Sequence, residues 1–542
     1  MISFLFIRDF LTSLFEEIKK DLGRFFVLVF TLIGIFNRFR NLGHPYIYTD
    51  ESISSLAAVN GFSHFPPLLP SGSEYFGHWT HTYLLTFSYK ILGHTDWAGR
   101  LPSAVLGILS IPLIYIVGKK IFNKEVGLLS SGLLTFSSIS IFWSRMIRHY
   151  SLLLFIVLLI LFTYFNYLDK PKKNIISLFI LFTLGFFTFP PVISLLPAII
   201  IIHLIILNKQ IYINWILPAY ILIFVLGLSL FVLDFPFLRF FEKILVNLVG
   251  ESRTNFKGLS FLTPHSMVKV LIILSLIIST LLVTFYMYYG GSKKDKVISS
   301  LNLVPFLVLI VIPMFSGDIR TRYFFFYLPI FLLFSSYIFF KITEKSFSKL
   351  SFLEFRKEYL KISVLVIFIL LIPFLTSLAP QVTLNNIFKD SFLYTYPKNP
   401  EKGPHQFGPP FIKVRPAAEK IKLTDSEENI KEPIPVVSTS KAFTGTNSLY
   451  RYLNYYDYSN NIKDLEYKMY SYVKTEKTKI SFYLPIEKLG NDKELLEVMD
   501  RNKQGWVVLS GRYEADQILL EEIGDELNQT YNSSKITVYR WS

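Results

Sequence analysis

The chain of 542 residues is rich in apolar side chains and poor in charge. Apolar residues make up 51% and charged residues 18%, and 55 Lys and Arg against 40 Asp and Glu give a formal net charge of +15. Because soluble domains carry about 25% charged residues, the composition argues against a purely soluble protein and excludes a disordered one. With no cysteine, a disulfide framework, a thiolate metal site and a cysteine nucleophile are all excluded.

Long apolar blocks predict a polytopic α-helical membrane protein, because a membrane-crossing helix needs about 20 mostly apolar residues. The first expected span has a short apolar run, Phe25–Phe36, and crosses only if Arg24, Arg38 and Arg40 reach toward the lipid headgroups. Residues 1–23 mix apolar and charged side chains and predict an amphipathic helix on the membrane surface. We expect about eleven spans, near residues 24–40, 101–117, 126–143, 151–168, 175–189, 191–207, 213–233, 266–289, 297–315, 323–340 and 362–379.

Lysines fall in alternate loops between the expected spans. They occur at 119, 120 and 124, at 170, 172 and 173, at 209, at 293, 294 and 296, and at 341, 345, 349, 357 and 361. Positive charge marks cytoplasmic loops, so this pattern places the N-terminus inside and the loop of residues 41–100 outside. Because the basic excess is explained by topology, no nucleic-acid partner is expected. The protein is predicted to lie in the cell (inner) membrane.

Residues 380–542 form a second predicted domain, on the outer side of the membrane, after the transmembrane domain of residues 24–379. Helical and strand patterns alternate along it, which is typical of an α/β domain. The tyrosine-rich stretch Tyr450–Tyr472 could stack on sugar, although tyrosines at an interface are the simpler interpretation. The expected helices are Lys413–Lys422, Lys493–Arg501 and Ala515–Leu527, and the expected strands are Pro435–Ser440, Ile480–Leu484, Gly505–Ser510 and Ile536–Tyr539.

The outer loops carry arginine where lysine is scarce. An arginine grips phosphate with two parallel hydrogen bonds, whereas lysine acts as a point charge. Headgroup anchoring or salt bridges with loop acids would explain any one of these arginines. For the set we favour a site for an anionic, membrane-borne ligand such as a lipid phosphate. Its members are Arg100, Arg145, Arg148, Arg239, Arg253, Arg320 and Arg322.

Asp50 and Glu51 are adjacent carboxylates just after the first expected span. Near a membrane surface and facing arginines, such a pair could supply a general base that activates an acceptor hydroxyl. Thr49 or Asp50 followed by Glu51 and Ser52 also has the pattern of a helix start. Both interpretations can hold, because a helix cap fixes a carboxylate in place.

The outer loop of residues 41–100 also contains five histidines. His78 and His81 have the spacing of one helix face, so a metal site with Glu74 or Asp50 is conceivable. We favour polar interfacial histidines over metal ligands. No cofactor is certain, and a divalent metal is left open and not required. The five are His44, His64, His78, His81 and His94.

Four motifs together resemble the GT-C membrane glycosyltransferases, and within that superfamily the protein O-mannosyltransferase and aminoarabinose (lipid A) transferase type. The first motif, Arg38–Glu51, resembles the first-loop signature of these enzymes, and Gly93–Ser103 resembles the end of that loop. Ser144–Tyr150 is similar to the opening of their fourth span, and Arg320–Pro329 to their late outer-loop motif. The resemblance covers roughly residues 25–340 in order and spacing.

This resemblance implies an inverting glycosyltransferase that moves a sugar from a polyprenyl-phosphate donor to an acceptor on the outer face. It implies Asp50 as the catalytic carboxylate, with Glu51 assisting. The donor phosphate would be neutralised by Arg145, Arg148 and Arg322, with Arg100, Arg320 and Tyr150 as further donor-site candidates. The resemblance does not imply an obligatory metal. The Trp-Trp-Asp signature of oligosaccharyltransferases is absent, which argues against transfer of a whole glycan to asparagine.

A lipid-linked sugar transporter or flippase without transferase activity is the alternative function. Transporters place polar residues at mid-membrane, whereas here most spans are clean, His203 being an exception, and the polar cluster lies at the outer rim. We therefore favour the enzyme. Its expected partners are membrane lipid, the lipid-linked donor, and a protein, lipid or glycan acceptor that the sequence does not specify.

Overall fold

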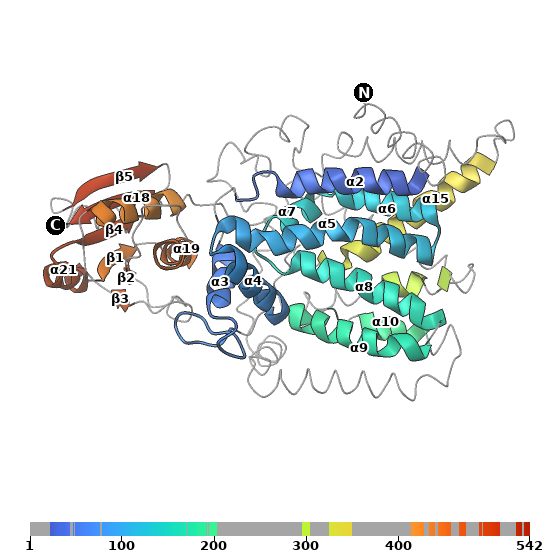
Figure 1. Cartoon of the computed structure of the whole chain (residues 1–542), viewed down its shortest axis with the longest axis horizontal. Coiled ribbons are helices and arrows are strands. Elements are labelled where there is room, and N and C mark those ends of the chain that lie inside the picture. Colours follow the sequence, from blue (N-terminus) through green and yellow to red (C-terminus); the bar gives the residue numbers. More distant parts are fainter. Residues whose placement is uncertain are drawn as a thin grey trace, which may run out of the picture. The chain divides into compact units, whose positions relative to one another are not determined.

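A computed structural model gives the fold (Figure 1). Apart from a few single positions, it describes the following residues: 22–43, 49–75, 78–169, 171–190, 195–202, 298–303, 325–348, 414–427, 433–438, 443–456, 466–472, 487–489, 492–509, 527–533 and 536–541. Residues 1–21 of the predicted amphipathic segment and the predicted spans 213–233, 266–289 and 362–379 lie outside these residues, while residues 22 and 23 begin the first described helix.

The chain divides into two compact units that alternate along the sequence. The first contains residues 1–31, 109–135 and 153–371, and the second contains residues 32–108, 136–152 and 372–542. Three helices are divided between the units, namely α2 (Leu22–Phe39), α5 (Asp96–Ile121) and α8 (Tyr150–Asp169), and the last residue of a fourth, Phe136 of α6, belongs to the second unit. The second unit holds every described residue of the candidate site.

The first unit is helical in its described part. Besides the later portions of α5 and α8, it contains α6 (Lys124–Phe136), α9 (Pro171–Thr188), α10 (Leu195–Ile201) and α15 (Leu328–Ser348). Helices α5 and α6 approach closely where Gly118 faces Gly127. A Cβ on Gly127 would lie 2.5 Å from the carbonyl oxygen of Tyr115. Small residues at such a crossing let two backbones touch, which is a common way to pack helices in a membrane.

Two of the described helices are long and apolar enough to cross a membrane. They are α5, with a mean hydropathy of 2.0, and the span Tyr150–Leu168 of α8, with a mean hydropathy of 2.3. Asn174–Thr188 and Phe325–Lys341 are shorter apolar helices. The predicted spans 24–40, 101–117, 151–168 and 175–189 are each helical. The total of about eleven spans stays a prediction.

One predicted span is wrong as a single helix. Residues 126–143 form α6 and then a separate helix, α7 (Ser138–Ser144). The break comes at Ser137, whose backbone is extended (φ −62°, ψ 110°) and whose side chain accepts a hydrogen bond from the Ser140 amide at 3.3 Å. Serine at this position caps a new helix by satisfying an amide that has no intrahelical partner.

In the second unit, the predicted outer loop of residues 41–100 is largely helical. It contains α3 (Thr49–Val59) and α4 (Trp79–Leu92), followed by the start of α5. Thr86 of α4 donates to the Ala58 carbonyl of α3 at 2.9 Å, and Ser88 donates to the Ala98 carbonyl of α5 at 2.6 Å. These buried hydrogen bonds fix α3 against α4 and α4 against α5.

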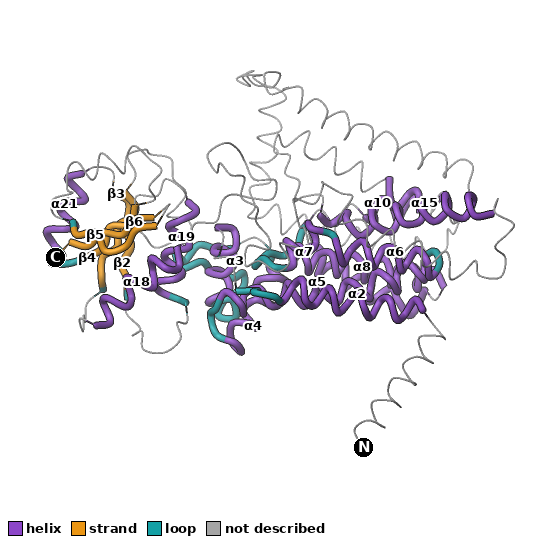
Figure 2. Tube along the Cα trace, turned by 90° about the horizontal axis from the view of Figure 1, so that it is seen from above, coloured by secondary structure: helices purple, strands orange, loops and turns teal. Residues whose placement is uncertain are grey.

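The C-terminal part of the second unit is the predicted α/β domain, and its mixed sheet confirms that prediction. The strand order is β3-β2-β1-β4-β6-β5, with parallel pairing from β3 to β4 and antiparallel pairing of β4, β6 and β5. Figure 2 shows these strands in orange. The strands are β1 (Ile434–Ser438), β2 (Tyr467–Tyr472), β3 (Glu487–Leu489), β4 (Gly505–Leu509), β5 (Asn528–Ser533) and β6 (Ile536–Trp541).

Three described helices accompany this sheet: α18 (Val414–Glu427), α19 (Phe443–Asn454) and α21 (Asp492–Arg501). Trp506 of β4 donates to both carboxylate oxygens of Asp425 at 3.1 and 3.0 Å, which ties α18 to the sheet. Elements α18, α21, β1, β4 and β6 confirm predicted ones. The predicted strand 480–484 and helix 515–527 lie outside the described residues. Elements α19, β2, β3 and β5 were not predicted from the sequence.

Candidate active site

Asp50 and Glu51 lie in the first turn of α3 but in opposite surroundings. The Glu51 side chain is 0% exposed, whereas that of Asp50 is 24% exposed. Consecutive residues of a helix point about 100° apart, so one carboxylate of an adjacent pair can be buried while the other remains open to a ligand. Of the two predicted carboxylates, Asp50 is therefore the one that solvent and substrate can reach.

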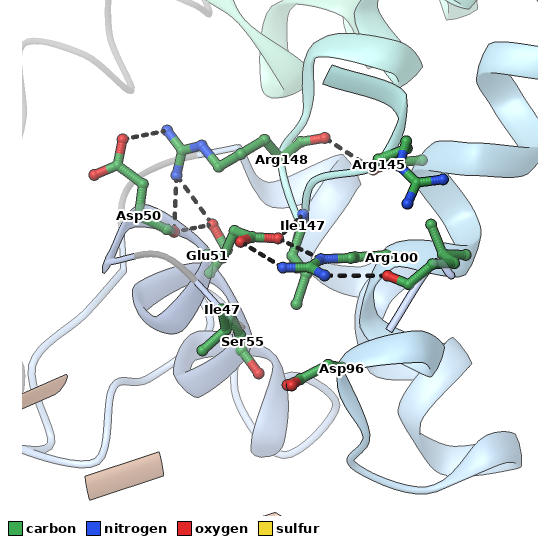
Figure 3. Close-up of polar contacts among 12 residues, drawn as sticks. Ile47, Asp50, Glu51, Ser55, Asp96, Arg100, Arg145, Ile147 and Arg148 are labelled. Atoms are coloured by element: carbon green, nitrogen blue, oxygen red, sulfur yellow. Dashed lines mark hydrogen bonds and ion pairs between the residues drawn. The ribbon is translucent and has the colours of Figure 1, made fainter. Parts of the chain in front are cut away.

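Glu51 and Arg100 form a buried ion pair with two parallel hydrogen bonds (Figure 3). The Nε atom of Arg100 lies 2.9 Å from Oε1 of Glu51, and its Nη2 atom lies 3.0 Å from Oε2. Oε1 also accepts from the Ile147 amide at 2.8 Å, and Arg100 donates to the Leu42 carbonyl at 3.1 Å. The pair thus joins α3, α5, the end of α2 and the segment before α8. This geometry gives both residues a supporting role and leaves the Arg100 fork engaged by a carboxylate rather than open to a phosphate.

Replacing Glu51 by alanine is expected to destabilise the protein by about 3–5 kcal/mol, because it leaves the Arg100 guanidinium buried without its carboxylate. Thermal unfolding of the purified protein, followed by intrinsic fluorescence, measures this change. The double variant E51A/R100M removes both charges and should recover much of the lost stability. An E51A protein that unfolds at the wild-type temperature would contradict this role.

Arg148 is the arginine that the fold places beside Asp50. Its Nη1 atom donates to the Asp50 carbonyl and to the Ser54 hydroxyl, both at 3.1 Å, and its Nη2 atom lies 3.8 Å from Oδ2 of Asp50. Within the described part of the chain, its buried Nε atom has no hydrogen-bond partner. Burial would lower the pKa of Arg148, but Asp50, Tyr150 and Tyr75 raise it above its ordinary value. The guanidinium therefore keeps its charge.

An aromatic ring, that of Tyr150, lies beside this guanidinium. The Cζ atom of Arg148 lies 6.0 Å from the centre of the Tyr150 ring, and that ring packs against Trp143 with centroids 4.1 Å apart. His81 of α4 is also buried nearby, and burial, with a smaller contribution from the Arg148 charge, lowers its pKa to about 3. His81 is therefore neutral at physiological pH, and Arg148 is the cation of this group.

Arg145 does not converge with Arg148. Its Nη1 atom donates to the carbonyls of Asn37, Arg38 and Arg40 at 3.1, 3.2 and 2.5 Å, and its Nη2 atom donates to that of Asn41 at 3.0 Å. Figure 3 shows the Arg145 and Arg148 side chains pointing in opposite directions. The last carbonyls of a helix lack intrahelical partners, and Arg145 satisfies those at the end of α2. The predicted meeting of these two arginines is therefore not seen.

Arg38 corrects the expectation that the arginines of the first span reach toward headgroups. Its side chain is fully buried, and it donates to Ser144 at 3.2 Å and to Ser140 at 3.1 Å, both on α7. A Cβ on Gly107 of α5 would lie 2.1 Å from the Ser144 hydroxyl. Glycine at this position gives the polar group its space between α2, α5 and α7.

The remaining predicted site residues are two arginines of the late outer loop and two histidines at the start of α4. Arg320 and Arg322 lie outside the described residues. His78 precedes α4 in a left-handed conformation (φ 59°), and its ring stacks on that of His149 with centroids 3.4 Å apart. Among the described residues, no group of three His, Cys, Asp or Glu side chains is placed to hold a metal ion. His78 and His81 gain no support here as metal ligands.

The sequence and the fold resemble those of known proteins. Residues 79–233 match the family model described as dolichyl-phosphate-mannose-protein mannosyltransferase. The fold matches ArnT from Cupriavidus metallidurans in the apo state with a TM-score of 0.57 and 11% identity, over 96% of this chain and 98% of that chain. The predicted GT-C resemblance is confirmed. Residues 79–233 therefore resemble this mannosyltransferase family in sequence, and the chain as a whole has the fold of ArnT.

Two further GT-C structures are similar. ArnT from Cupriavidus metallidurans bound to undecaprenyl phosphate matches with a TM-score of 0.53 and 11% identity, over 95% of this chain and 97% of that chain. The Archaeoglobus fulgidus oligosaccharyltransferase in the apo form matches with a TM-score of 0.49 and 12% identity, over 96% of this chain and 74% of that chain. No curated protein sequence matches the chain.

Proposed function

We propose that this GT-C glycosyltransferase transfers a sugar from a polyprenyl-phosphate donor to an acceptor hydroxyl on the outer face of the membrane, with Asp50 as general base. One observation carries the proposal: a partly exposed carboxylate lies beside a charged guanidinium, Arg148, on a helix that a buried ion pair holds in place. A base and a phosphate-binding cation at one position are what this transfer requires. The family description and the undecaprenyl phosphate bound to ArnT support the donor class.

In the proposed reaction, the Asp50 carboxylate accepts the proton of the acceptor hydroxyl. The hydroxyl oxygen forms a bond to the anomeric carbon from the face opposite the phosphate. The bond between that carbon and the phosphate oxygen breaks, and its electron pair leaves with the polyprenyl phosphate. Arg148 stabilises the negative charge that grows on this leaving group. Attack from the opposite face inverts the anomeric configuration.

The proposed donor site contains fewer phosphate-binding residues than the sequence alone predicts. Arg148 contacts the phosphate, and the Tyr150 ring packs beside the Arg148 guanidinium. Arg100 and Arg145 do not contact the phosphate and instead stabilise the fold around it. Arg320 and Arg322 keep their predicted role as further phosphate ligands. Glu51 positions α3 instead of taking part in proton transfer.

The proposed arrangement in the membrane follows the lysine pattern of the sequence. The transmembrane domain of residues 24–379 crosses about eleven times, with lysine-rich loops in the cytoplasm. Asp50, Arg148 and the domain of residues 380–542 then lie on the extracytoplasmic side of the cell membrane. The polyprenyl chain of the donor runs among the spans while its phosphate stays at headgroup depth.

The test uses purified enzyme with undecaprenyl-phosphate mannose and undecaprenyl-phosphate aminoarabinose as donor probes, and envelope protein and lipid fractions as acceptors. We expect one probe to be consumed, with release of undecaprenyl phosphate and an inverted anomeric configuration in the product. The Asp50→Asn protein is the control for background cleavage. Movement of an uncleaved probe across vesicles would instead support a flippase, and a retained configuration would exclude the direct displacement proposed here.

A further inference from the structure

Asp96, the first residue of α5, accepts hydrogen bonds from three side chains of the C-terminal domain. Its partners are Arg451 at 2.8 Å, the Tyr452 hydroxyl at 2.9 Å and Arg415 at 3.2 Å. The Asp96 and Arg451 side chains are each 1% exposed. A carboxylate held by two guanidiniums and a hydroxyl away from water has a tightly fixed position.

Arg451 makes a second buried contact, and this one reaches the helix that carries Asp50. Its Nε atom donates to the Ser55 hydroxyl of α3 at 2.6 Å, and that hydroxyl lies 2.6 Å from the Tyr89 hydroxyl of α4. Ser55 follows Glu51 by about one helical turn. A single guanidinium of α19 therefore joins α3 to the start of α5.

The next residue of α19 holds the approach to the same helix. The Tyr452 hydroxyl accepts from the Ile47 amide at 3.1 Å, just before α3 begins, while it donates to Asp96. Leu449 and Leu453 of α19 belong to the same buried apolar cluster as Leu56 of α3. Both the polar and the apolar contacts thus place α19 directly against the helix that carries the catalytic carboxylate.

Helix α3 is consequently fixed to α5 at two levels. Glu51 binds Arg100 directly, and Ser55, one turn later in α3, is linked through Arg451 to Asp96, one turn earlier in α5. Figure 3 shows Ser55 and Asp96 on the side of the Glu51–Arg100 pair that lies away from Arg148. One attachment point would leave a short helix free to rotate or tilt about it, whereas two points define the direction in which Asp50 projects.

We propose that Arg451 of the C-terminal domain is a positioning residue for the transfer reaction, which acts through Ser55 and Asp96 to orient α3 and the Asp50 carboxylate. The inference rests on the proposed role of Asp50. A buried ion pair adds little net stability, and in some proteins its role is to fix one geometry. A displacement of about 1 Å at a reacting group can cost on the order of 100-fold in rate.

The test compares full-length Arg451→Met, Arg451→Lys and Ser55→Ala with the control Arg501→Met, which removes an arginine that is 76% exposed in the same domain. Transfer from the undecaprenyl-phosphate sugar that wild type consumes is measured, with kcat expressed per donor-binding site. We expect kcat to fall roughly 30- to 100-fold in Arg451→Met. The KM for the donor should stay within about twofold, because Arg148 is not altered. Arg501→Met should equal wild type.

The milder variants separate positioning from folding. Arg451→Lys keeps a positive charge beside Asp96, but its single ammonium group cannot bind both Asp96 and Ser55. We therefore expect kcat to recover partly relative to Arg451→Met. Ser55→Ala removes only the link to α3 and should lower kcat by about 3- to 10-fold. Amide hydrogen exchange in α3 should quicken in both Arg451→Met and Ser55→Ala. A role confined to folding would instead lower the yield of binding-competent protein and leave kcat per site at the wild-type value, which would overturn the proposal.

The failure of this inference is distinguishable from failure of the proposed function. If Asp50→Asn is inactive but Arg451→Met and Ser55→Ala keep wild-type kcat per site and wild-type exchange in α3, only the positioning role is wrong. If Asp50→Asn is fully active, the proposed function is wrong and the inference falls with it.

Discussion

Replacing Asp50 by asparagine is expected to lower kcat for sugar transfer by about 10²- to 10⁴-fold, because the acceptor hydroxyl loses the base that takes its proton. The fold should survive. The hydrogen bonds from Arg148 and Ser54 end on the backbone carbonyl of Asp50, which the substitution leaves in place. Transfer of label from an undecaprenyl-phosphate sugar by the purified variant measures the effect.

The matched control for this variant is Asp500→Asn, which makes the same chemical change at an exposed position of α21. It should turn over at the wild-type rate. An Asp50→Asn enzyme that keeps more than about half of the wild-type kcat would remove Asp50 from the role of base. The observation would then favour an acceptor that is already an anion and needs no deprotonation.

Replacing Arg148 by alanine is expected to reduce kcat by about 10²- to 10³-fold, because the leaving phosphate loses the guanidinium that stabilises its charge. Arg148→Lys keeps the charge but loses the planar fork, so its defect should be smaller. Steady-state kinetics with the same donor over a range of donor concentrations measure both variants.

The Arg148 variants require a control that separates loss of donor binding from loss of stability. The guanidinium also holds Ser54 and the Asp50 carbonyl, so the thermal unfolding temperature of each variant must be recorded with its rate. A rate loss in Arg148→Lys without a change in unfolding temperature assigns the effect to the donor. Wild-type donor use by a folded Arg148→Ala protein would contradict phosphate binding at this position.

The residue pattern alone identified the carboxylate pair, and only the resemblance to known enzymes assigned the catalytic role to Asp50. Asp50 and Glu51 differ in exposure because α3 turns one side chain outward and buries the other against Arg100, 49 positions away. The helical geometry alone predicts that adjacent carboxylates diverge. The direction of the protein interior comes only from tertiary structure, so the residue pattern alone could not choose between them.

The same dependence on tertiary structure explains why the expectations for Arg145 and Arg38 were wrong. Arg145 and Arg148 belong to one motif and both are typical of phosphate binding, but Arg145 lies where the last carbonyls of α2 need donors. Arg38 resembles a headgroup anchor in sequence, yet two serines of α7 give it a buried polar site. Signals for such partners are weak because serine is common in apolar helices. In contrast, Ser137 was a detectable signal, since a serine followed by Ser138 and Ser140 can cap a new helix.

The contacts of the C-terminal domain had no signal in sequence at all. Arg415, Arg451 and Asp96 look like ordinary surface charges, because their partners are more than 300 positions away. The periodic patterns predicted an α/β domain and three of its six described strands, β1, β4 and β6. Pairing between distant charged residues follows from how the elements pack, which local patterns do not encode.

The most direct test of the central claim is a cryo-EM map of the enzyme with undecaprenyl phosphate bound. We expect the phosphate within hydrogen-bonding distance of the Arg148 guanidinium, with the Asp50 carboxylate facing the space where the sugar would attach. A phosphate bound elsewhere, with Arg148 still closed on Asp50 and Ser54, would contradict the account.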